Sequence, residues 1–180
     1  MNSKWPWKII SSKNIYKNPW IQLTEEEVEN DKWEKRLYWI INMVDWVSVL
    51  AMDKNQNVYL TEEFRYALEE DSIELVSWWI DSGEDAILCA QRELKEELWI
   101  TAKKWIDLWE TNPFTWIIKS NSKLFLATDL IFGDALEEMK MIKLTLEEAK
   151  DMVINSKITH SPSCVLIMKA YFYVNRGVFK

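Results

Sequence analysis

Residues 78–100 read WWIDSGEDAILCAQRELKEELWI, and the rest of the chain is organised around this stretch. From Glu84 to Leu98 the apolar residues recur at helical spacing, which predicts one amphipathic helix. We expect Ser82 to be its N-cap, and the acidic residues that follow suit the positive end of the helix dipole. The helix should therefore turn an apolar face to the core and a second face, rich in carboxylates, away from it.

That second face suggests a chemical role. Glu93 and Glu97 lie one helical turn apart, and Glu96 lies on the adjoining side. Three carboxylates that converge from one rigid helix make a hard-oxygen site, which suits Mg²⁺ and a phosphate-bearing substrate. A Glu-rich run is otherwise most often a solvated helix face, so the spacing of the charges has to decide.

The spacing resembles the Nudix box of the Nudix hydrolase family, G-x5-E-x7-R-E-U-x-E-E-x-G-U with U aliphatic. The matching residues are Glu84, Arg92, Glu93, Leu94, Glu96, Glu97 and Ile100. At roughly 6% usage per charged residue type, five fixed charges match a given window by chance on the order of once in a million. The spacing therefore favours the family over a solvated face.

Both glycines of the box are tryptophan here, at Trp78 and Trp99. The chain contains 12 Trp and 3 Gly, whereas ordinary usage would give about 13 glycines in a chain of this length. Further tryptophans where turn chemistry could favour glycine are Trp33, Trp46, Trp79, Trp109 and Trp116, with weaker cases at Trp5 and Trp39. We hypothesise that many of these are glycines encoded by a reassigned UGA codon. The alternative is a naturally Trp-rich protein.

Length, charge and hydropathy limit the number of domains and the kinds of partner that the chain can have. The 180 residues fit a single domain over 1–180, with N-terminal strands in residues 1–35. The net charge of -7 argues against a nucleic-acid partner, which requires a basic face. The N-terminus has no long apolar segment, and the apolar stretch from Cys164 to Val174 is short and interrupted by Lys169. We expect a cytoplasmic protein with no membrane partner and with free thiols.

Strand patterns and helix caps predict the fold. Strands are expected over residues 8–16, 20–28, 36–44, 47–52, 58–66, 73–77, 104–110, 116–118, 123–130 and 140–144, with an acidic loop over 67–72. Thr145 and Glu148 form a capping box for a helix to Asn155, and Ser161-Pro162 opens a final helix to Val174. Mixed strands with helices on their faces indicate an α/β (α+β) fold, an α/β/α sandwich with a mixed sheet. The Nudix resemblance implies the same architecture.

The resemblance extends, more weakly, from about residue 36 to residue 172. Residues 60–84, LTEEFRYALEEDSIELVSWWIDSGE, are similar to a segment of ADP-ribose pyrophosphatase-type members. Arg65 then falls on a family arginine near the substrate diphosphate, although it could equally be a surface arginine at a strand end. Asn112-Pro113 resembles the downstream proline that marks the same branch.

The resemblance also implies a ligand set and a mechanism. Glu93, Glu96 and Glu97 match the metal ligands of the family, and the backbone carbonyl of Trp78 is a further candidate ligand. The metal would be Mg²⁺, with Mn²⁺ as a substitute, and in the family it activates water to attack one phosphorus. Arg92 and Glu84 match a charge-assisted pair that holds the loop against the helix.

Three other residues have open roles. Glu137 and Glu138 lie in a loop that carries a general base or metal-ligand glutamate in the ADP-ribose branch, or they form an ordinary exposed acidic loop. His160 is the only histidine, and we interpret it as structural or as a support for the side chains of the site.

The resemblance implies Mg²⁺-dependent hydrolysis of a nucleoside diphosphate linked to another moiety. ADP-ribose or an ADP-sugar, giving AMP and a sugar phosphate, is the favoured substrate. The alternatives are another nucleotide sugar, a noncanonical dNTP, or a nucleotide-binding regulatory module without catalysis. Relatives of this branch are often homodimers, and the strands within residues 1–35 are the candidate interface.

Overall fold

The computed structural model describes residues 3–133 and 141–176. The chain divides into two compact units, one made of Met1–Val44 with Asn112–Asn121 and the other of Asp45–Thr111 with Ser122–Lys180. The second unit contains the helix of the Nudix-like motif. A single functional domain over residues 1–180 stays a prediction.

The N-terminal unit is a five-stranded sheet in the order β1-β2-β3-β4-β10. Its strands are β1 (Ser3–Lys4), β2 (Trp7–Lys17), β3 (Ile21–Glu29), β4 (Lys35–Met43) and β10 (Ile118–Lys119). Neighbouring strands are antiparallel except β10, which is parallel to β4. Asn18 Oδ1 accepts the backbone N–H groups of Trp20 at 2.9 Å and Ile21 at 2.7 Å, which confirms the turn expected between β2 and β3.

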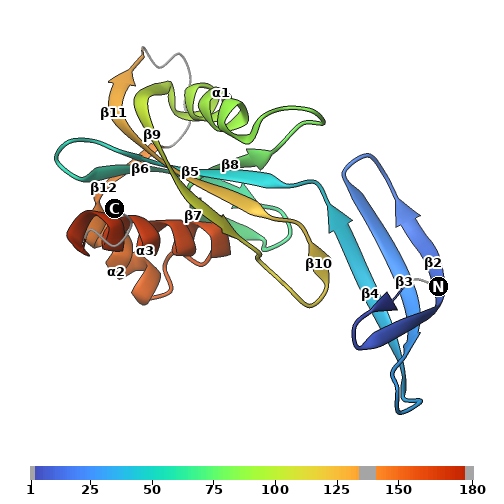
Figure 1. Ribbon diagram of the computed structural model, residues 1–180. Coiled ribbons are helices and arrows are strands. Elements are labelled where there is room, and N and C mark those ends of the chain that lie inside the picture. The colour runs from blue at the N-terminus through green and yellow to red at the C-terminus, as the bar shows by residue number, and fades with distance from the viewer. Residues whose placement is uncertain (1–2, 134–140, 177–180) are drawn as a thin grey trace. The chain divides into compact units, whose positions relative to one another are not determined.

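The second unit is a seven-stranded mixed sheet with helices on both faces (Figure 1). The order β12-β6-β5-β11-β9 forms the main path, with β7 paired to β6 and β8 to β5. The strands are β5 (Trp46–Met52), β6 (Asn57–Arg65), β7 (Glu70–Glu74), β8 (Val76–Trp79), β9 (Ile100–Thr111), β11 (Ser122–Phe132) and β12 (Met141–Thr145). Only β5 and β11 pair in parallel. Helix α1 (Ala86–Leu98) covers one face, while α2 (Leu146–Ile154) and α3 (Ser161–Arg176) cover the other.

Alternation along β5 explains these two helical layers. Val47, Val49 and Ala51 are buried in the cluster that contains residues of α1, whereas Leu50 and Met52 are buried with residues of α2 and α3. Successive side chains of a strand point to opposite faces, so a strand with apolar residues on both faces needs cover on both. The predicted α/β/α sandwich with a mixed sheet is therefore confirmed.

The region around residues 67–77 differs from the prediction. The expected loop over 67–72 is wrong in its second half, because β7 begins at Glu70. The expected strand over 73–77 is two strands, one ending at Glu74 and the other beginning at Val76. The break falls at Leu75, whose backbone N–H donates to Ser163 Oγ at 3.0 Å. One apolar run can therefore supply two different strand pairs.

The start of α1 also differs from the prediction. Its N-cap is Asp85, whose side chain accepts the N–H of Ile87 at 2.9 Å, and the expected cap at Ser82 is wrong. The N–H of Glu84 donates to the carbonyl of Asp81 at 2.9 Å, closing a turn in which Gly83 has φ 84°. That turn keeps the backbone out of the helical region until Asp85. The capping box of Thr145 and Glu148 at α2 is confirmed.

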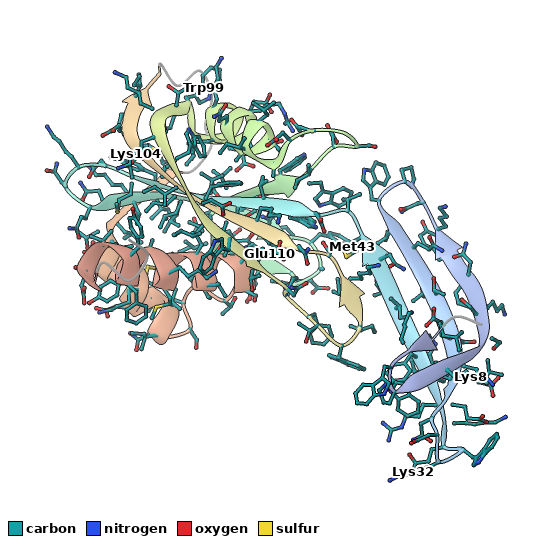
Figure 2. All side chains as sticks on the ribbon, in the orientation of Figure 1. Lys8, Lys32, Met43, Trp99, Lys104 and Glu110 are labelled. Atoms are coloured by element: carbon teal, nitrogen blue, oxygen red, sulfur yellow. The ribbon has the colours of Figure 1, made fainter. Side chains whose placement is uncertain are left out.

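Three of the suspect tryptophans have the backbone conformation that favours glycine. Trp33, Trp99 and Trp109 have φ values of 64°, 54° and 67°. Trp99 is the C-cap of α1, and it follows the last turn of that helix in Figure 2. Trp78 and Trp79, in contrast, lie on β8 and do not have positive φ. The backbone argument for glycine therefore holds at position 99 and not at position 78.

Candidate active site

The carboxylate-bearing helix is fixed by its apolar face. Cys89, Ala90, Leu94 and Leu98 of α1 are all buried against the sheet. Glu93 neighbours this buried stripe, and the whole residue is 4% exposed. A carboxylate at such a position requires a partner, because burial without one is costly.

Arg92 is the partner that the structure supplies. Its Nε donates to Glu84 Oε1 at 3.2 Å and its Nη2 donates to Glu84 Oε2 at 3.1 Å, while Nη1 contacts Glu93 Oε1 and, at 3.3 Å, Glu96 Oε2. The bond from Arg92 holds the pKa of the Glu84 carboxyl below its ordinary value. The two-point contact joins the turn before α1 to the helix.

Glu97 lies near three other carboxylates, those of Glu93, Glu63 and Glu74. Burial first, and then the charges of Glu93, Glu63 and Glu74, raise the pKa of the Glu97 carboxyl to about 8, with Arg65 acting in the opposite direction. The pKa of Glu93 is also raised, by burial first and by the charges of Glu96 and Glu84. Like charges held this close favour protonation or a bound cation.

Arg65 is the last residue of β6 and lies near the carboxylates of Glu63, Glu74 and Glu97. Its Nε donates to Glu74 Oε1 at 3.0 Å and its Nη2 to Glu74 Oε2 at 2.6 Å, and Nη1 lies 2.9 Å from Glu63 Oε2. Tyr59 and Arg65 are six residues apart on β6, and Tyr59 is buried with residues of α1, so alternation places Arg65 on the face of the sheet that α1 covers. Its side chain is 34% exposed, so it remains accessible to a ligand.

Glu93 interacts with both other carboxylates of the box. The charge of Glu96 acts on Glu93, and the charge of Glu93 acts on Glu97. Glu96 also lines an open groove of about 830 Å³ between α1 and β9, together with Arg92, Lys95, Trp99 and Trp105. A space of this volume can take a nucleotide-sized ligand. Trp78, the fourth predicted ligand, lies on β8 and pairs with Val47 of β5.

The donor set fits a hard divalent cation. Within residues 3–133 and 141–176, no three acidic, His or Cys side chains are gathered closely enough to form a ready metal cluster. Among the described residues, the charged groups that act on Glu97 include the carboxylates of Glu93, Glu63 and Glu74, and carboxylate oxygens are ligands that Mg²⁺ and Mn²⁺ prefer. The raised pKa of Glu97 arises from burial and unneutralised negative charge, and a bound cation would offset the second of these causes.

Two predicted residues cannot be placed. Glu137 and Glu138 lie outside the described residues.

In the parts of the chain that are described, no helix is long and apolar enough to cross a membrane.

Sequence reasoning missed Glu63 and Glu74 as neighbours of the carboxylate row. Glu63 and Arg65 are two residues apart on β6, so alternation alone could have placed them on one face. Glu74 comes into contact with Arg65 through the β6–β7 pairing, in which Thr61 lies opposite Glu74. That signal becomes visible only when the strand register is known.

Comparison with known proteins gives four findings: one family model, two relatives and one solved structure. The family model of the nucleoside diphosphate sugar hydrolase N-terminal domain matches residues 7–31. An ADP-ribose pyrophosphatase of Bacillus subtilis (strain 168) is 28% identical over 159 residues, covering 84% of this chain and 85% of that protein. A methanol dehydrogenase activator of Bacillus methanolicus is 25% identical over 169 residues, covering 89% of this chain and 90% of its own. The solved structure of an ADP compounds hydrolase matches with a TM-score of 0.81 at 17% identity, covering 99% of both chains.

Proposed function

We infer the function of this chain from the premise that it is a Nudix ADP-ribose pyrophosphatase-like protein. The resemblance indicated by the sequence is confirmed, and with it the prediction of a Nudix hydrolase. We propose that the chain hydrolyses the anhydride of an ADP-linked sugar, with ADP-ribose as the favoured substrate. One water is consumed, the bond between the two phosphates breaks, and AMP and a sugar phosphate are released.

The observation that carries this proposal is that Arg65 lies near Glu97, so that the two charges act on each other. A diphosphate has to be held by positive charge and brought to a site that can activate water. Arg65 supplies the fixed positive charge at the edge of the site. The crowded carboxylates on α1 supply the negative charge that a divalent cation requires.

The proposal gives each residue one task. Glu93, Glu96 and Glu97 would hold Mg²⁺ or Mn²⁺, with the carbonyl of Trp78 as an additional donor. Such an ion, when bound, supplies a polarised phosphate and an activated water. Arg65 would orient the diphosphate through its guanidinium edge.

The remaining residues shape or complete the site. Arg92 and Glu84 keep the loop against α1, since their two-point contact spans the turn at Gly83. Glu137 and Glu138 stay the candidates for the general base.

A substrate panel tests the proposal. The chain is incubated with Mg²⁺ and ADP-ribose, ADP-glucose, UDP-glucose, NAD⁺ or a noncanonical dNTP, and the products are separated by ion-exchange chromatography. The proposal expects AMP and ribose 5-phosphate from ADP-ribose as the fastest reaction. Faster cleavage of a dNTP or of a UDP-sugar would move the chain to another Nudix branch. Binding of ADP-ribose without turnover of any compound would indicate a regulatory module.

We also propose that the N-terminal sheet pairs two copies of the chain. Several apolar side chains of this N-terminal unit are exposed, namely Ile10, Ile15, Tyr16, Trp20 and Leu37. Exposed apolar side chains collected on one sheet are common at interfaces between proteins. Light scattering coupled to size exclusion tests this, because a mass of one chain at micromolar concentration would contradict it.

A further inference from the structure

We propose that His160 is a positioning residue for substrate binding. It holds the buried carboxylate of Glu74 in place, and Glu74 in turn holds the guanidinium of Arg65 where a diphosphate can meet it. This inference rests on the proposed function in one respect only, namely that Arg65 is the group that binds the diphosphate. His160 lies directly before α3, far in sequence from both partners.

Glu74 is the centre of the arrangement. Its side chain is 5% exposed, and both of its oxygens accept a hydrogen bond from Arg65. Burial alone would raise the pKa of Glu74, yet the bonds and charges of Arg65, His160 and Ser72 outweigh burial and lower it. Glu74 therefore stays ionised, and a buried ionised carboxylate has to be held on every side.

His160 lies beside the carboxylate of Glu74, and Ser163 bonds the backbone that follows it. His160 Nδ1 lies 3.5 Å from Glu74 Oε2 and 2.7 Å from Ser163 Oγ. Ser163 is fully buried, and its Oγ also accepts the backbone N–H of Leu75, the residue after Glu74. Burial lowers the pKa of His160, so the ring is neutral at pH 7, and the tautomer with its proton on Nδ1 turns an N–H toward Glu74 and Ser163. The start of α3 thus fixes both the backbone after Glu74 and its carboxylate.

The need for such support comes from competing carboxylates. Glu63 also contacts Arg65, and Glu97 attracts it from α1. The Glu63 side chain is 59% exposed and therefore free to move, so it cannot fix a direction for the guanidinium. If Glu74 shifted, Arg65 would be drawn toward Glu63 or Glu97 and away from an incoming diphosphate. His160 therefore acts on substrate binding through two intermediate side chains, without touching the substrate.

A double-mutant cycle tests the proposal. His160→Ala should raise the KM for ADP-ribose by on the order of 10-fold while kcat stays within about 2-fold, since the loss is one of positioning in ground and transition states alike. His160→Asn places an amide near the Nδ1 position and should restore KM to within about 3-fold of the unsubstituted chain. In the Arg65→Ala background, His160→Ala should change KM by less than about 2-fold, because the pathway is already broken.

Two outcomes of the cycle would overturn the proposal. One is an equal KM effect of His160→Ala with and without Arg65. The other is a His160→Asn variant that folds with an unchanged melting temperature and yet binds as weakly as His160→Ala. Either outcome would leave His160 with a structural role alone.

A second measurement separates failure of this proposal from failure of the proposed function. If no diphosphate of the panel is cleaved, the hydrolase assignment fails, and the contact is then read without substrate by NMR. Hydrogen exchange of the Arg65 Nε–H should become at least about 5-fold faster in His160→Ala and stay unchanged in His160→Asn. The Arg92 Nε–H, which donates to Glu84, is the matched control and should not respond. An unchanged Arg65 exchange rate would overturn the role of His160.

Discussion

Arg92 donates two hydrogen bonds to the carboxylate of Glu84, from Nε at 3.2 Å and from Nη2 at 3.1 Å, across the turn that precedes α1. The same guanidinium contacts Glu93 and Glu96 through Nη1. One arginine therefore joins the loop to the row of carboxylates, so the geometry of the loop and that of the site are coupled. A substitution at the start of α1 should therefore alter both the conformation of the loop and the positions of the carboxylates.

The first prediction concerns the start of that helix. Asp85→Ala removes the side chain that accepts the Ile87 N–H and should lower the free energy of unfolding by ~1 kcal/mol. Ser82→Ala is the matched control, because Ser82 does not cap the helix, and it should change stability by less than about 0.5 kcal/mol. Urea denaturation followed by circular dichroism measures both. A larger effect at Ser82 than at Asp85 would contradict the observed cap.

The second prediction concerns Arg65. Arg65→Lys keeps the charge but cannot make the two-point contact with Glu74, so KM for ADP-ribose should rise on the order of 10-fold with a smaller change in kcat. Arg65→Ala should raise KM further, and it should also destabilise the fold because it leaves the buried Glu74 without its main partner. Steady-state kinetics and a thermal melt separate the two effects. An unchanged KM in both variants would remove Arg65 from the site.

The third prediction concerns pH and Glu74. The folded pKa of Glu74 lies below its ordinary value, so its ionisation favours the folded state above the unfolded pKa, near 4.5. That contribution should be lost as pH falls from about 5 through the lower folded pKa. The melting temperatures of the unsubstituted chain and of Glu74→Gln should therefore differ at pH 6 and converge toward pH 3. Glu70→Gln, at an exposed position of β7, is the control and should give a constant difference.

The fourth prediction concerns the tryptophans. Trp99→Gly relieves a left-handed backbone position and should raise the free energy of unfolding by ~1 kcal/mol, and Trp33→Gly and Trp109→Gly should act in the same direction. Trp78→Gly should bring no such gain, because that residue is in an extended strand.

Trp105→Gly is the opposite control for these variants. Its ring packs edge-on against Phe125 at 6.4 Å and its Nε1 donates to the carbonyl of Ala102, so its loss should cost ~3 kcal/mol or more. Calorimetry measures all the variants, and the codons of the gene at positions 33, 99 and 109 test the UGA hypothesis directly. Loss of stability in all three glycine variants would mean that these tryptophans belong to the fold.

Local patterns in the sequence were sufficient to predict much of the second unit, which is made of Asp45–Thr111 and Ser122–Lys180. The spacing of the apolar residues predicted α1, and the apolar run over residues 47–52 predicted β5. Each of these two signals lies within one short segment of the chain. The capping box at Thr145 is local in the same sense, and it was correct.

What could not be predicted depends on contacts between distant segments. Glu74 meets Arg65 through the β6–β7 register, and His160 meets Glu74 only because α3 begins beside β7. The cap of α1 was misplaced because Ser82 and Asp85 are both suitable cap residues, and the turn at Gly83 decides between them. No spacing rule within one segment contains this information.

The central claim is that the carboxylates of α1 carry out a cation-dependent hydrolysis, and turnover of Glu93→Gln and Glu97→Gln tests it most directly. Each variant is assayed with ADP-ribose over a Mg²⁺ titration, with Glu147→Gln on α2 as a matched exposed control. The account predicts that kcat falls on the order of 10²-fold or more in both variants, with melting temperatures close to that of the unsubstituted chain. It also predicts full activity for the control. Wild-type turnover in both variants would contradict the claim and place the reaction elsewhere in the molecule.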